Sequence, residues 1–173
     1  RSVELARQYG RELAAAVDEV LDGEMRPVSG GLTTSYREIE LPLAELPGRE
    51  ELEKDSQSKN KYVAARAKYL LKEIDAGEPL AGTYPYPIGV WRIGDRVRLV
   101  ILGGEVVVDY ALRLKAELGS EELDRTDVWV AGYANDVMAY IPSRRVLEEG
   151  GYEGAGAMVY YGLPTTWAPE VEE

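Results

Sequence analysis

One nearly apolar stretch of the chain decides the fold. Residues 97–105 have the sequence VRLVILGGE, an apolar run that ends in two glycines and a glutamate. Such a run, bounded by turn residues, is typical of a central strand that is covered on both faces. Gly103 and Gly104 end the strand, and Glu105 is expected to begin a helix that extends to about Leu118.

The segments on either side of this stretch predict a mixed sheet. A hairpin through Gly94-Asp95 joins the strand at 97–102 to a strand at 88–93, and a further buried strand is expected at 127–133. Because a helix connects the strands at 97–102 and 127–133, we expect these two strands to be parallel neighbours.

The remaining segments complete a layered α/β domain. Amphipathic helices are predicted at 2–21 and 59–76, and an alternating, half-buried strand at 32–43. Residues 83–87 predict a rigid, proline-rich loop. From Ala134 onward we expect a long irregular segment rich in tyrosine and glycine. The order of elements favours an α/β fold with a mixed sheet and helices packed on it.

The charge and composition limit the partners. The 173 residues include 31 Asp and Glu against 20 Lys and Arg, so the net charge is −11. Phosphate backbones are bound by Lys and Arg, and we therefore expect no nucleic-acid partner. No run approaches the roughly 18 apolar residues that a transmembrane helix needs. The absence of Cys agrees with a cytoplasmic location and equally with a secreted or periplasmic one.

The chain also contains no His. A Ser-His-Asp triad, a Cys nucleophile and a complete His-based metal site are therefore excluded within this chain. Any acid, base or metal ligand must be an Asp, Glu, Tyr, Lys, Ser, Thr or Asn side chain, or must come from another polypeptide.

The carboxyl ends of the two parallel strands predict where a site lies. Glu105 follows the first strand, and Asn135 and Asp136 follow the second. Sites in α/β sheets collect outside such strand ends, so we expect these residues to converge. Each also has a purely structural explanation. A glutamate in the first turn stabilises a helix, the pair Gly103-Gly104 permits a tight turn, and Asn-Asp forms turns.

The segment Tyr140–Trp167 is the third feature that could carry a function. Its tyrosines lie among glycines and prolines, and irregular segments of this length are usually functional or disordered. The alternative is that the tyrosines simply pack with their hydroxyls at the surface. A carboxylate pair such as Glu105 and Asp136 among these aromatics would suit a carbohydrate-active enzyme if the carboxyls lay about 5–10 Å apart.

Short motifs follow one another over about Leu99–Pro164. They are Gly104-Glu105, the helical Arg113-Leu114-Lys115, Asn135 with Tyr140 five positions later, Tyr152-Glu153-Gly154-Ala155, and Gly162. Eleven residues separate the tyrosines at 140 and 152. In this order the motifs resemble the C-terminal part of the catalytic domain of neutral/alkaline (non-lysosomal) ceramidases, including some bacterial members.

The resemblance implies a zinc-dependent amidase that hydrolyses an N-acyl bond, as in N-acylsphingosine. It implies that Glu105 and Tyr140 are zinc ligands and that Tyr152 stabilises the oxyanion. The supporting residues that it implies are Gly104, Asn135, Asp136 and Glu153. The family completes its zinc site with two histidines from the N-terminal part of the domain, which here must come from outside this chain.

This interpretation makes residues 1–173 a single α/β domain that forms the C-terminal half of a larger ceramidase-like catalytic domain. Its partners would be the upstream half of the same protein and a small-molecule or lipid amide substrate. The isolated, His-free chain is expected to be inactive. Two alternatives stay open: a non-catalytic α/β domain for binding or assembly on the same scaffold, and the carbohydrate-active enzyme.

Overall fold

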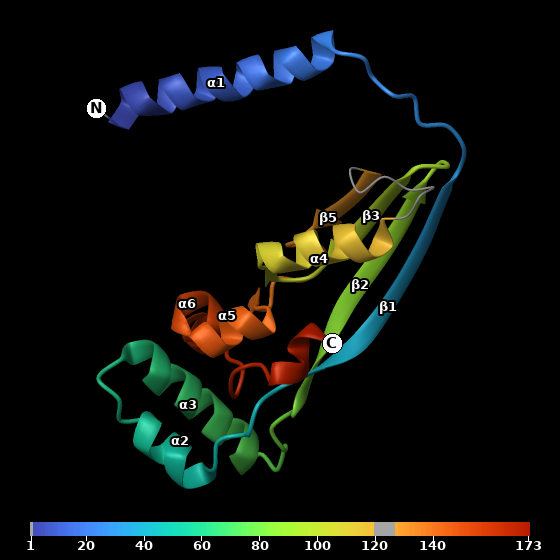
Figure 1. Cartoon of the computed structure of the whole chain (residues 1–173). Coiled ribbons are helices and arrows are strands. Elements are labelled where there is room, and N and C mark those ends of the chain that lie inside the picture. Colours follow the sequence, from blue (N-terminus) through green and yellow to red (C-terminus); the bar gives the residue numbers. More distant parts are fainter. Residues whose placement is uncertain (1, 120–126) are drawn as a thin grey trace.

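The computed structural model describes residues 2–119 and 127–173, and its centre is a four-stranded sheet (Figure 1). The strands lie in the order β1-β2-β3-β5, with bounds Leu32–Pro42, Thr83–Ile93, Val97–Leu102 and Val128–Ala131. β1 and β2 are antiparallel, as are β2 and β3, whereas β3 and β5 are parallel. The predicted mixed sheet, hairpin and parallel neighbours are therefore confirmed.

One face of the sheet is covered by helix α4 (Val108–Leu118) and by the C-terminal segment. Tyr110 and Leu114 of α4 pack against the buried Val100 and Leu102 of β3. Trp167, from the C-terminal segment, is buried in the same core. Val100 and Leu102 of β3 therefore lie in the main core.

A second, smaller core lies between helices α2 (Arg49–Asp55) and α3 (Lys61–Asp75). It is formed by Leu52, Ala67 and Leu70, all of them buried. Asn60 caps α3, since its side-chain oxygen accepts a hydrogen bond from the backbone N–H of Tyr62. Figure 1 shows this helix pair at the end of the sheet opposite the β2–β3 hairpin.

Two predicted boundaries are wrong. Glu105 does not begin a helix: it lies in the short strand β4 (Glu105–Val106), and α4 begins only at Val108. Three consecutive valines follow Glu105, and β-branched residues favour extended backbone. Residues 83–87 are not a loop but the first half of β2, paired with β1. Pro85 and Pro87 are tolerated there because β3 pairs with β2 only from Ile88 onward.

The C-terminal segment is also more regular than predicted. It contains strand β6 (Tyr140–Ile141), helices α5 (Arg144–Glu149) and α6 (Gly151–Gly154), and the 3-10 helices η2 (Gly156–Tyr160) and η3 (Pro169–Glu172). Each element is too short to leave a hydrophobic period in the sequence. Ser143 caps α5, and Trp167 donates to the Tyr140 carbonyl, so tertiary contacts order this segment.

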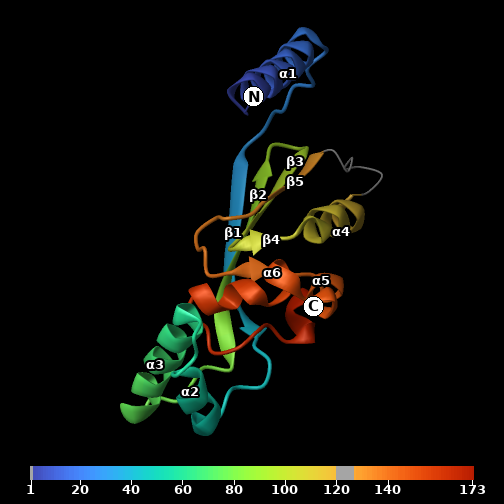
Figure 2. The same ribbon diagram turned by 90° about the vertical axis from the view of Figure 1, so that its left-hand side faces the viewer.

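Helix α1 (Ser2–Asp22) lies apart from the rest of the molecule (Figures 1 and 2). Its predicted bounds are nearly right, but none of its residues is buried. None of the helices in the described ranges is both long and apolar enough to span a membrane.

Candidate functional site

The structure brings Glu105 and Tyr140 side by side. They are direct partners in the two-stranded parallel sheet formed by β4 and β6. The Glu105 N–H donates to the Ala139 carbonyl at 2.9 Å, and the Val107 N–H donates to the Ile141 carbonyl at 3.2 Å. The backbone therefore fixes the distance between the two side chains that the sequence nominates as zinc ligands.

The carboxylate of Glu105 binds two phenols. The phenols of Tyr133 and Tyr140 both interact with it, and this interaction with the carboxylate raises the pKa of Tyr133 to about 12 and that of Tyr140 to about 12. Each phenol therefore stays protonated to a higher pH than an ordinary tyrosine. The result is one carboxylate held between two tyrosines, with Glu105 and Tyr140 half-buried and Tyr133 exposed.

Tyr133 is the site residue that sequence reasoning missed. Its backbone is left-handed, with φ 55°, and its N–H donates to the Gly104 carbonyl at 2.7 Å. This conformation turns the chain out of β5 and next to Glu105. The one available signal was its place at the end of the predicted strand 127–133, two residues before Asn135, which is also left-handed, with φ 70°.

Gly104 links the ends of the two parallel strands. Its N–H donates to the Asp136 carbonyl at 2.8 Å, and its φ is 64°. A Cβ placed on Gly104 would lie 2.6 Å from the Ala139 carbonyl oxygen and 2.9 Å from the Met138 sulfur. A side chain at this position would therefore push apart the two segments that carry Glu105 and Tyr140.

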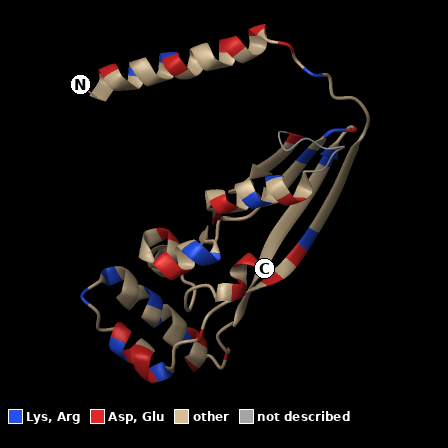
Figure 3. Ribbon diagram, viewed as in Figure 1, with Lys and Arg blue, Asp and Glu red and all other residues tan. Residues whose placement is uncertain are grey.

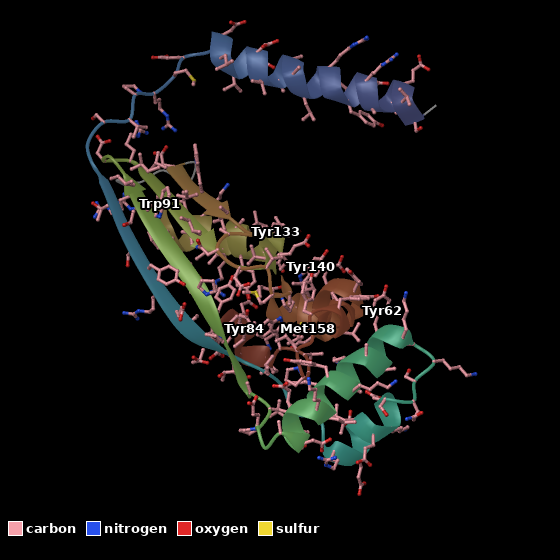
Figure 4. All side chains as sticks on the ribbon, turned by 180° about the vertical axis from the view of Figure 1, so that it is seen from behind. Tyr62, Tyr84, Trp91, Tyr133, Tyr140 and Met158 are labelled. Atoms are coloured by element: carbon pink, nitrogen blue, oxygen red, sulfur yellow. The ribbon has the colours of Figure 1, made fainter. Side chains whose placement is uncertain are left out.

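Tyr152 extends the site along a row of aromatic rings. Its ring centroid lies 5.5 Å from that of Tyr140, at an interplanar angle of 73°, which is the edge-to-face arrangement favoured by aromatic pairs. Tyr160 lies 6.2 Å beyond Tyr152, and Tyr62 of α3 lies 4.7 Å beyond Tyr160. Figure 4 shows Tyr133, Tyr140 and Tyr62 in this order from the sheet towards α3.

The other nominated residues have separate roles. The Asp136 carboxylate accepts a hydrogen bond from the Tyr84 hydroxyl at 2.6 Å. Burial, together with this hydrogen bond, raises the pKa of Tyr84 to about 12. The backbone of Asp136 therefore contacts Gly104 beside the site. Its carboxylate binds Tyr84, which is not one of the tyrosines next to Glu105. Glu153 is exposed on α6 next to Tyr152.

The donor atoms of this site are oxygens. Within residues 2–119 and 127–173, no group of three or more Asp, Glu, His or Cys side chains could hold a metal ion. Glu105 and Tyr140 together offer one carboxylate and one phenol, and zinc accepts carboxylate oxygen at about 2.0–2.2 Å. The chemistry of the pair fits part of a zinc coordination shell, and at least two further ligands would be needed to complete it.

Comparison of the chain with protein-family models, with curated proteins and with solved structures finds no match in any of the three. Evidence on function therefore comes from the residues and geometry of the site.

Proposed function

We propose that this chain carries the carboxylate and phenol half of a zinc-dependent amidase site of the neutral-ceramidase type. One observation supports the proposal above all. Tyr140 follows Glu105 by 140 − 105 = 35 positions, and Tyr152 follows Tyr140 by 152 − 140 = 12 positions. The three residues nevertheless form one contiguous cluster. These are the three residues to which the family resemblance gives chemical roles.

Glu105 and Tyr140 would hold the zinc ion, and two histidines from the upstream half of the protein would complete its coordination. Bound zinc polarises a substrate carbonyl and lowers the pKa of coordinated water to about 7. Tyr133, whose phenol interacts with Glu105, would help to orient the carboxylate, as outer partners of metal ligands commonly do.

Tyr152 would act on the substrate. The residue is 51% exposed, and its ring lies against that of Tyr140. A phenol donates a hydrogen bond to the carbonyl oxygen of an N-acyl group as that oxygen gains negative charge, and such donors stabilise the transition state. The substrate class is a small-molecule or lipid amide.

No specific observation favours the carbohydrate-active alternative. Glu105 and Asp136 each bind their own tyrosines, Tyr133 and Tyr140 in one case and Tyr84 in the other. The non-catalytic alternative shares the same scaffold and differs from the proposal in expecting no hydrolysis.

Hydrolysis of an N-acyl amide by the longer protein, with its upstream half present, tests the proposal. We expect Tyr152→Phe to lower kcat by about 10²–10³-fold, the usual cost of losing one oxyanion donor. The matched control is Tyr62→Phe, at the far end of the aromatic row, which should leave kcat unchanged. Absence of hydrolysis with zinc present, or equal effects of the two substitutions, would support the non-catalytic domain.

A further inference from the structure

Helix α1 presents an apolar stripe that no other described part of the chain covers. Tyr9, Leu13, Val17 and Val20 recur at three- and four-residue spacings and so lie on one face of the helix. Their exposed fractions range from 55% to 70%. Its charged residues lie mainly on the opposite face (Figure 3). An amphipathic helix normally buries such a stripe against another element.

Among the described residues, the sheet presents a second partly exposed apolar surface, on the face opposite α4. Trp91, Leu99 and Trp129 lie side by side in one row across β2, β3 and β5. Trp91 is 41% exposed and Trp129 is 56% exposed. Tyr36, on the same face of β1, is 59% exposed. Figure 2 shows α4 on one side of the sheet only, and Figure 4 shows Trp91 from the open side.

The outer edge of β1 is a third surface. β1 is the first strand in the sheet order, so within the described residues it pairs with β2 alone over Leu32–Leu41. The end of this edge is closed by the C-terminal segment, where the Ala168 N–H donates to the Pro42 carbonyl at 3.0 Å. Leu32–Tyr36 carries no charge, whereas charged residues begin at Arg37 (Figure 3). An open, uncharged edge is a template for pairing with another strand.

The three surfaces meet at the hairpin end of the sheet because the chain after α1 is attached there. The buried carboxylate of Asp127 binds Arg26 at 3.0 Å and Arg96 at 3.1 Å. The Asp95 N–H donates to the Ser29 carbonyl at 3.1 Å. α1 therefore leaves the body beside the hairpin, and its 21 residues extend about 31 Å from it.

We propose that two copies of this chain form a symmetric dimer in which the β1 edges pair and each α1 packs on the open sheet face of the other copy. An antiparallel strand edge is complementary to itself, and the helix stripe and the sheet face are complementary to each other, as a two-fold interface requires. If α1 folded back onto its own sheet, or if the upstream half of the protein covered these surfaces, the β1 edges of two copies would not pair.

The exposed aromatic residues supply a large part of the area that a stable dimer needs. A fully covered aromatic side chain buries roughly 150–250 Å². Tyr9, Tyr36, Trp91 and Trp129 are each 41–59% exposed. These four residues can therefore bury about 100 Å² each, or about 800 Å² in two equivalent contacts. The aliphatic residues of α1 and the strand edge raise the total towards the roughly 1,200–2,000 Å² of stable interfaces.

Light scattering and sedimentation of the full chain test the dimer. One copy has a mass of 19.2 kDa, so the expected mass is 2 × 19.2 = 38.4 kDa. Leu13→Lys introduces a charge into the apolar stripe and should return the mass to that of one copy. The matched control is Ala15→Lys, on the opposite face of the same exposed helix, which should leave the dimer intact.

Hydrogen exchange separates the dimer from a helix that folds back on its own chain. In the dimer, amides of α1 and of Leu32–Tyr36 become protected as the protein concentration rises, and Leu13→Lys removes that protection. A single-copy mass at every concentration, protection of α1 independent of concentration, or equal behaviour of the two lysine variants would overturn the proposal.

Discussion

At the scale of single residues, the candidate site depends on Gly104. Its positive φ and the 2.6 Å gap between its ideal Cβ and the Ala139 carbonyl oxygen leave room for no other residue. This glycine allows Glu105 to lie beside Tyr140 and allows Tyr133 to reach back over the strand end. Its role is thus to bring three chain segments into contact.

Gly104→Ala should destabilise the fold by about 2–4 kcal/mol, because it adds backbone strain to a steric overlap with the neighbouring segment. The control is Gly162→Ala, where φ is 75° but no atom lies within 4 Å of the added Cβ. That variant carries only the backbone cost of about 1–2 kcal/mol. Urea unfolding measures both free energies, and equal losses would contradict the crowding at Gly104.

The sequence predicted Glu105, Tyr140 and Tyr152 as site residues, and the structure places them together. Their roles in zinc binding and catalysis stay predictions. Tyr133 could not be predicted in the same way, because its contact with Glu105 depends on a left-handed backbone that sequence does not specify for tyrosine. The separate partner of Asp136, Tyr84, was missed for a similar reason: the contact joins residues 52 positions apart.

At the scale of elements, long periodic segments were predictable and short ones were not. The helices at 2–21 and 59–76 and the hairpin at Gly94-Asp95 have clear periods or turn residues, and the structure confirms them. β4 and β6 have two residues each, so no period exists to detect. They form because each pairs with the other, which is a tertiary effect.

The loop between β5 and β6 is fastened to β2 by the hydrogen bond from Tyr84 to Asp136. Tyr84→Phe should destabilise the fold at pH 8 by about 1 kcal/mol, since a part-buried hydrogen bond to a carboxylate is lost. The folded-state pKa of Tyr84 is raised from 10.0 to about 12. The extra stability of the wild type over Tyr84→Phe is therefore fully present below pH 10. It is lost as the pH rises through about 12, where the phenol ionises in the folded state.

The difference in unfolding free energy between wild type and Tyr84→Phe should therefore shrink between pH 8 and pH 11.5. Urea unfolding at both pH values measures it. Tyr69→Phe, an exposed tyrosine of α3, should show no difference at either pH. A gap between wild type and Tyr84→Phe that stays constant with pH would contradict the coupling to Asp136.

At the scale of the whole molecule, the chain combines a Glu105–Tyr140 cluster, which we propose to be half of a zinc site, with exposed apolar surfaces. α1 and the open sheet face lie towards the hairpin end of the sheet (Figure 1). Composition bears on the first property, because a chain without His and Cys cannot complete a His-based zinc site. The second required the structure, since an amphipathic period predicts a helix but not whether that helix finds a partner.

Zinc binding by the chain in the presence and absence of imidazole tests the half-site most directly. At a fixed concentration of free zinc and without imidazole, we expect a Kd weaker than about 1 μM. This Kd corresponds to a binding free energy of about 8 kcal/mol. Complete structural zinc sites have binding free energies of roughly 10–16 kcal/mol. Imidazole replaces the missing histidines and should tighten binding at least about 10-fold, or about 1.4 kcal/mol.

Glu105→Gln and Tyr140→Phe should abolish the effect of imidazole, whereas Glu149→Gln, which removes an exposed carboxylate of α5, should not. Tight one-to-one zinc binding without imidazole would contradict the account, as would an imidazole effect that survives both Glu105→Gln and Tyr140→Phe.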